Sequence, residues 1–175
     1  MTVRNKFSPL GKPGIDSYPP ETVLFENRPA NEAKTQVELP ILEGVYELMC
    51  CSGGGGQWCY LGCNQGAAGS FFKGVVYFPE AKTLQIQVGG GTSGYAHGGY
   101  DTYITDCIHC PGGRSANSSC PGNTAAPTLM DGMQVISAEI NAGGKCHSGS
   151  LFPGTDYGSI RASGYMKLTY LRLEP

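Results

Sequence analysis

Polar and apolar positions alternate in short stretches along this chain. The clearest alternation is at 83–88, where Leu84, Ile86 and Val88 share one face and Thr83 begins the polar face. A period of two residues predicts a half-buried β-strand. Similar short stretches, bounded by Gly or Pro, predict strands at 22–26, 35–39, 45–51, 70–78, 101–105, 133–140 and 164–173. The best helical window, 31–37, is short and polar, so the chain is predicted to be all-β.

The alternation also assigns faces within the later strands. In the last strand Met166, Leu168 and Tyr170 share one face, which is expected to be the core face. In the strand at 133–140, regular alternation places Val135 and Ala138 on opposite faces. These patterns predict a single antiparallel β-sandwich or jelly roll with glycine-rich loops.

Two glycine clusters, at 53–56 and 89–91, each follow the end of a predicted strand. Because both of these strands contribute an apolar face to the same core, the clusters are expected near each other at one end of the sandwich. Glycine there lets backbones approach closely and adopt positive φ, with short polyproline-II-like segments. Neither cluster is followed by the GK[ST] of a phosphate-binding loop or by a helical pattern, which disfavours phosphate binding.

The order of these motifs resembles the glycine-rich domain of bacteriophage tail-fibre adhesins and of prophage proteins from gut bacteria. The matching pieces are Phe25-Glu26, Val37 to Pro40, Gly44 to Glu47, Gly53 to Gly56, Gly66 to Phe72, Gly74 to Val76, Leu84 to Gly91, Thr102 to Ile104 and Gly164 to Tyr170. The resemblance covers about residues 22 to 175 and implies host-surface adhesion. The chain departs from the family in its eight cysteines and in a lower glycine content than members that stack polyglycine helices.

The 175 residues are enough for one domain with a sizeable core. Residues 22–175 are expected to form it, and residues 1–21, which are rich in Pro and Gly, an extended N-terminal arm. Phe7, Leu10, Ile15 and Tyr18 could anchor this arm on another subunit, whereas a merely solvated tail would need no such anchors. Both interpretations stay open.

Charge and hydropathy narrow the possible partners. Charged residues make up 15% of the chain and the net charge is −2, which is typical of neither a nucleic-acid-binding nor a membrane-surface protein. No apolar run is long enough to span a membrane, and no signal-peptide pattern is present. The expectation is a protein made in a bacterial host cytoplasm and destined for the virion.

The eight cysteines allow three states: free thiols, disulfides formed after release from the cell, or a metal site. Free thiols are favoured, because cytosolic disulfides are uncommon. Cys107 and Cys110 have the spacing of half a zinc site, which Cys120 with Cys146 or His147 could complete, but no second closely spaced pair supports it. Adjacent Cys50 and Cys51 should face opposite sides of their strand.

Signals of catalysis are weak. No nucleophile or metalloprotease motif occurs, and the many Asp and Glu residues are expected to be solvated loop acids rather than a catalytic pair. We therefore expect no enzyme activity and no cofactor.

Aromatic residues near the glycine clusters are the better candidates for a binding site. Tyr60 follows the first cluster, and Tyr95, His97 and Tyr100 follow the second. Tyr, Trp and Gly on loops of a rigid β scaffold commonly form binding surfaces. Trp58 is expected to cover the domain's own core instead.

Two functions remain. The first is a non-enzymatic virion structural protein, in a tail fibre or head fibre, with an exposed tip that binds a host glycan or protein. Such a protein should form a homo-oligomer, plausibly a trimer, and contact other virion proteins. The alternative is a stand-alone carbohydrate-binding, lectin-like module. The N-terminal arm distinguishes these two functions, because a soluble lectin does not need such a segment.

Overall fold

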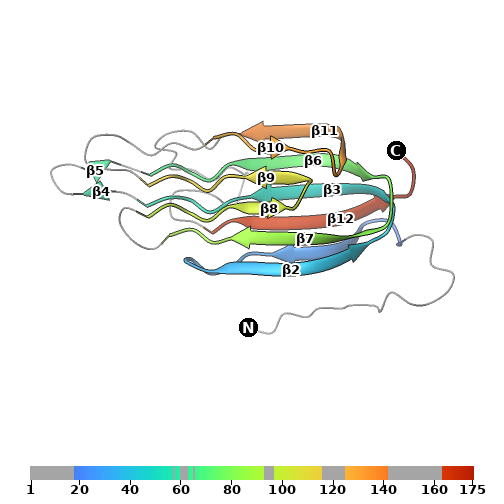
Figure 1. The fold of residues 1–175 in the computed structure, drawn as a ribbon, viewed down its shortest axis with the longest axis horizontal. Helices are drawn as coiled ribbons and strands as arrows, with labels where there is room; N and C mark the ends of the chain where they lie inside the picture. Colours follow the sequence, from blue (N-terminus) through green and yellow to red (C-terminus); the bar gives the residue numbers. More distant parts are fainter. Residues whose placement is uncertain are drawn as a thin grey trace.

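The protein is a β-sandwich of two antiparallel five-stranded sheets (Figure 1). The computed structural model describes residues 18–56, 58–59, 63–64, 66–92, 97–115, 125–141 and 163–175, and these contain no helix. The strands are β1 (Thr22–Asn27), β2 (Lys34–Ile41), β3 (Gly44–Cys51), β4 (Trp58–Cys59), β5 (Cys63–Asn64), β6 (Phe71–Phe78), β7 (Lys82–Gly89), β8 (Thr102–Ile104), β9 (Ile108–Cys110), β10 (Thr128–Leu129), β11 (Gln134–Asn141) and β12 (Tyr165–Arg172). The prediction of an all-β sandwich is confirmed.

The first sheet has the order β1-β12-β3-β6-β11, and the second has the order β10-β9-β8-β7-β2. Short β4 and β5 pair only with each other. The main core lies between the two five-stranded sheets and takes large side chains from both. Tyr46, Phe72 and Leu168 come from the first sheet, and Ile86 and Ile104 from the second.

The sequence explains where several strands lie in the sheets. β7 is internal, and its alternating Leu84, Ile86 and Val88 are buried in the core as predicted. β2 contains Pro40, which has no N–H for a ladder, and β2 lies at the edge of its sheet. In β12 the predicted core face, which includes Met166, is buried.

All eight predicted strands are present, with ends that differ by one or two residues. Four strands of two or three residues, β4, β5, β9 and β10, were not predicted, because runs this short carry little pattern. β8 is equally short, but it lies within the longer stretch 101–105 that was predicted.

The predicted faces of Val135 and Ala138 are wrong. Val135 pairs with Val76 and Ala138 with Gly74, so both lie on the same face of β11, although this edge strand leaves both exposed. A register irregularity between Val135 and Ser137 causes the change, since an extra residue in a bulge shifts the alternation that follows it.

Candidate functional site

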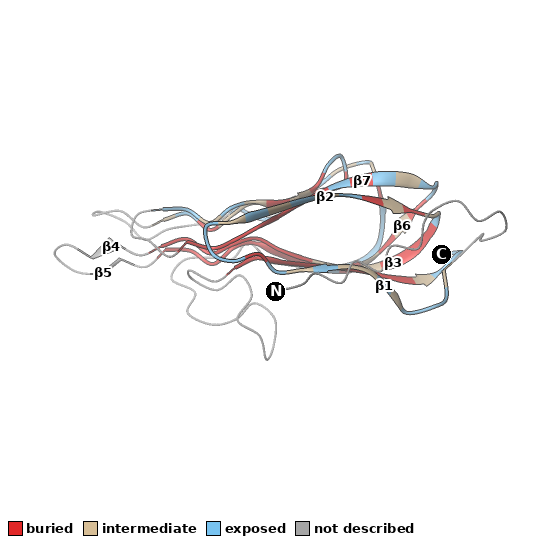
Figure 2. Cartoon of the chain, turned by 90° about the horizontal axis from the view of Figure 1, so that it is seen from below, coloured by how far each residue is buried: buried red, intermediate tan, exposed pale blue. Residues whose placement is uncertain are grey.

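The two predicted glycine clusters lie in contact, in a layer of extended backbone beyond the strands. Five segments form this layer, which we call the glycine layer: 52–56, 66–70, 89–92, 97–101 and 111–114. Segment 52–56 is fully buried although it carries almost no side chains. Figure 2 shows this buried backbone continuing from the sheets towards the end of the molecule opposite the C-terminus.

Successive residues of segment 52–56 hydrogen-bond to different neighbours. Gly53 N–H donates to the Tyr100 carbonyl at 3.1 Å, and Gly55 N–H to the Ala67 carbonyl at 2.9 Å. The Gly54 carbonyl accepts from Thr92 N–H at 3.2 Å. A β-strand bonds to at most two neighbours, whereas a backbone with three residues per turn points its polar groups in three directions. The pattern fits the polyproline-II-like segments that were predicted.

Close approach, and not positive φ, explains the need for glycine here. A Cβ on Gly53 would lie 2.0 Å from the Gly90 carbonyl oxygen, and a Cβ on Gly90 would lie 2.3 Å from the Ala30 carbonyl oxygen. The expectation that these clusters require positive φ is wrong, since Gly44 is the one described glycine with positive φ. The cluster glycines keep backbones within hydrogen-bonding distance of one another.

Two of the predicted binding residues are parts of the glycine layer. Tyr100 is partly exposed, its backbone bonds to Gly53 and Gly90, and its ring lies 4.4 Å from the Nζ of Lys34. His97 is exposed, and its carbonyl accepts a hydrogen bond from Gly56 N–H at 2.9 Å. Their side chains therefore lie on the surface of a hydrogen-bonded platform.

Other predicted positions lie outside the described residues. These are the binding candidates Tyr60 and Tyr95, the arm anchors Phe7, Leu10 and Ile15, the metal candidates Cys120, Cys146 and His147, and the side chain of Trp58. The fourth arm anchor, Tyr18, packs against the core of its own chain, with its ring edge-to-face with Tyr170 at 5.4 Å.

Four described cysteines, Cys50, Cys51, Cys107 and Cys110, are buried free thiols. Cys50 belongs to the main core and Cys51 to a small second cluster, which confirms that they face opposite sides of β3. Cys110 Sγ lies 3.8 Å from the Cys50 carbonyl oxygen, whereas Cys107 Sγ lies 3.9 Å from Lys82 Nζ. Cys107 and Cys110 thus have different partners.

The environment of these thiols does not favour ionisation. Burial raises the pKa of Cys51 and of Cys110 well above the ordinary thiol value. Burial also raises the pKa of Cys107, although Lys82 acts in the opposite direction. Among the described residues, no group of three or more His, Cys, Asp or Glu is placed to hold a metal ion.

A polar row on the outer face of the second sheet was not predicted. Cross-strand pairing aligns one residue from each of its five strands: Gln36, Gln87, Tyr103, His109 and Thr128. The polar alternation in β7 was visible in the sequence. The row itself was not, because the register between strands cannot be obtained from one strand's pattern.

Hydrogen bonds connect this polar row. Gln36 Nε2 donates to Gln87 Oε1 at 2.9 Å, and Gln87 Nε2 donates to the Asp101 carbonyl at 3.1 Å. His109 Nε2 and Asp101 Oδ2 are 2.9 Å apart, and Asp101 Oδ1 accepts from Gly112 N–H at 2.7 Å. Asp101 and Gly112 belong to the glycine layer, so this layer and the row share one network.

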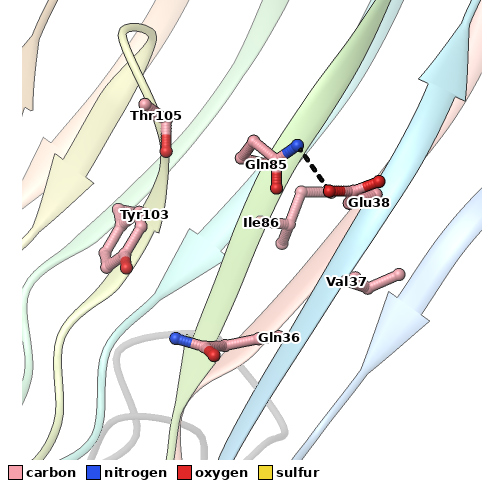
Figure 3. A pocket seen from close by; sticks show the side chains of 7 residues that line it. All are labelled: Gln36, Val37, Glu38, Gln85, Ile86, Tyr103 and Thr105. Carbon is pink, nitrogen blue, oxygen red and sulfur yellow. Dashed lines mark hydrogen bonds between the residues drawn. The ribbon is translucent and has the colours of Figure 1, made fainter.

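An open groove lies beside the row (Figure 3). Its lining comes from three neighbouring parts of the second sheet: β2, β7 and the β8 hairpin. The lining residues are Gln36, Val37, Glu38, Gln85, Ile86, Tyr103 and Thr105. Gln85 Nε2 donates to Glu38 Oε1 at 3.0 Å, as drawn in Figure 3. The groove thus presents amide, hydroxyl and carboxylate groups beside one aromatic ring.

Comparisons with protein-family models, with curated proteins and with solved structures gave no match. The described part of the chain contains no helix that is long and apolar enough to cross a membrane.

Proposed function

We propose that this protein is a non-enzymatic structural component of a virion, in a tail fibre or head fibre, and that its glycine layer supports an exposed host-surface-binding tip. The observation that carries the proposal is the packing of that layer. Five backbone segments hydrogen-bond to one another with almost no side chains between them, at the end of a side-chain-packed sandwich. The motif order that resembles phage adhesins adds support.

This arrangement suits a tip for a physical reason. A segment whose backbone groups are all paired is held rigidly without a hydrophobic core, so the side chains it carries are free to face a receptor. Tyr100 and His97 are two such side chains in the described part of the layer. Loops on a rigid scaffold can then change without loss of the fold.

The direct test is to find the chain in assembled particles. Virions purified from cells that produce the protein would be analysed by mass spectrometry, and an antibody against the purified chain would be imaged on them by electron microscopy. We expect the chain in the particles and the antibody at the end of a fibre. Intact particles that lack the chain would overturn the proposal.

The arm gives a second test of the assembly role. We expect a variant with Phe7→Ala, Leu10→Ala and Ile15→Ala to keep the stability of the wild type but to lose its place in the particle. On this proposal the three anchors are buried against a partner subunit, where each large apolar side chain contributes about 1.5–3 kcal/mol. Normal incorporation of the variant would favour a domain without an assembly role.

The alternative, a stand-alone carbohydrate-binding module, is favoured by one observation: the polar groove on the second sheet. Size-exclusion chromatography with light scattering distinguishes the two functions. We expect a fibre component to be an oligomer, such as a trimer, and a stand-alone module to be a monomer.

A further inference from the structure

The outer faces of the two sheets differ in chemistry along one corresponding row of paired residues. Across the first sheet, pairing aligns Glu26, Lys167, Met49, Lys73 and Glu139, so four of the five positions are ionised. The corresponding row across the second sheet consists of two Gln, one Tyr, one His and one Thr. Ionised side chains of both signs are typical of a solvated face, whereas a hydrogen-bonded row of amides and aromatic groups is typical of a binding face.

The side chains of the polar row are held in place before any ligand arrives. Gln87 is only 6% exposed, although it lies on the outer face, and Oε1 accepts hydrogen bonds from both Gln36 Nε2 and Tyr103 OH. The Tyr103 ring also packs edge-on against His109 at 6.2 Å between ring centroids. A ligand would therefore need to immobilise few side chains, which lowers the entropic cost of binding.

The groove keeps polar groups for a ligand. Among the described contacts, Gln36 Oε1 accepts no hydrogen bond, and the Tyr103 hydroxyl oxygen can still accept one. Glu38 has carboxylate lone pairs beyond the one that accepts from Gln85. Donors and acceptors beside an aromatic ring match a sugar, which presents hydroxyl groups at its edge and C–H groups on its face.

We propose that this groove on β2, β7 and the β8 hairpin binds an uncharged oligosaccharide. The inference rests on the proposed function in that a glycan is one receptor that a host-surface-binding protein would contact. Neighbouring strands lie about 4.8 Å apart, so three of them span about 10 Å, which suits a short run of sugar rings. The site lies on the outer face of the second sheet, and the tip residues Tyr100 and His97 are not among the residues that line it.

The charge of the groove lining indicates which class of glycan can bind. Glu38 is the one ionised residue in the groove lining, and no Lys or Arg lines it. An acidic glycan, a phosphate group or a nucleic acid would bring negative charge next to this carboxylate without a cation to balance it. A neutral sugar can donate hydroxyl hydrogen atoms to the same carboxylate.

The test uses the full-length, isotope-labelled protein and a defined set of neutral hexasaccharides: maltohexaose, cellohexaose, mannohexaose and chitohexaose. We expect at least one to shift the side-chain amide signals of Gln36 and Gln85 in a saturable way at millimolar concentration. Tyr103→Ala should weaken this binding about tenfold. Gln36→Ala removes an exposed side chain together with its hydrogen bond to Gln87 Oε1, and should weaken binding as well.

The matched control is Tyr77→Ala on the outer face of the first sheet, where the Tyr77 hydroxyl donates to Glu43 Oε1. This variant removes the same side chain from the other face and should leave binding unchanged. Hexagalacturonate, the acidic probe, should not bind. Failure of all four neutral probes to saturate, equal weakening by Tyr77→Ala, or tighter binding of the acidic probe would each overturn the inference. None of these results would affect whether the chain is found in particles.

Discussion

The body of the sandwich and the glycine layer are packed by different means. In the body, large side chains such as Phe72 and Tyr46 fill the space between the two sheets. In the glycine layer, backbone meets backbone, and a Cβ on Gly53 would lie 2.0 Å from a carbonyl oxygen. Removing atoms should therefore destabilise the body, whereas adding atoms should destabilise the glycine layer.

The largest expected effect is in the body. Phe72→Ala should lower the free energy of unfolding by about 3–5 kcal/mol, because Phe72 is fully buried between the sheets and its loss leaves a cavity. Denaturant unfolding monitored by circular dichroism measures this change. A loss below about 1 kcal/mol would show that the sandwich core can collapse around the missing ring.

In the glycine layer a single added methyl group should be costly. Gly53→Ala should destabilise the protein by about 1–3 kcal/mol, since the new Cβ must displace the Gly90 carbonyl and the hydrogen bond that it accepts from Tyr100 N–H. The matched control is Gly98→Ala, where the nearest atom to a Cβ is a carbonyl oxygen at 3.4 Å. Equal melting temperatures for the two variants would contradict tight backbone packing.

The junction between the two regions should respond to pH. Cys51 and Cys110 end β3 and β9, where the glycine layer begins, and burial raises the pKa of each well above 9.0. As pH rises, these thiols ionise in the unfolded protein before they ionise in the folded protein. The free energy of unfolding should therefore keep its full value below about pH 9, and above that pH it should fall by up to about 1.4 kcal/mol per pH unit for each thiol.

Denaturation midpoints between about pH 8 and about pH 10 measure this loss. The Cys51→Ala/Cys110→Ala variant is the control, because it removes both titrating groups and should show a flatter profile. An equally steep fall in that variant would assign the pH dependence to other groups.

The smallest expected effect concerns a contact between the two regions. Lys34 of β2 places its Nζ 4.4 Å from the centre of the Tyr100 ring in the glycine layer. Lys34→Gln should lower stability by about 0.5–1 kcal/mol, the range for an exposed cation–π pair. A double-mutant cycle with Tyr100→Leu measures the interaction energy of the pair. If Lys34→Gln lowers the free energy of unfolding by the same amount in the Tyr100→Leu background, the two residues do not interact.

Much of the body could be predicted from sequence because its strands follow local rules. The alternation in β7 and β12 identified both the strands and their buried faces. The prediction of faces in β11 was wrong because a bulge depends on the register with β6, which no local pattern encodes. The missed strand β9 is only three residues long and owes its place to pairing with β8.

The candidate sites were less predictable. The proximity of the two glycine clusters follows from strand order and was predicted, but the polar row joins residues from 36 to 128 that share no sequence pattern. Their alignment depends on four separate strand pairings, and each pairing is set by core packing on the opposite face.

The sequence alone determined the all-β class, the positions of eight of the twelve strands and the places where glycine allows close approach, because these depend on neighbours along the chain. Tertiary structure decided which backbones fill the space around those glycines and why positive φ is not needed there. It also decided that one row across the first sheet aligns charged side chains, whereas the row across the second sheet aligns two amides with Tyr103 and His109. Hydrogen bonds and pairing between distant segments form only when the two sheets pack, and no local preference specifies them.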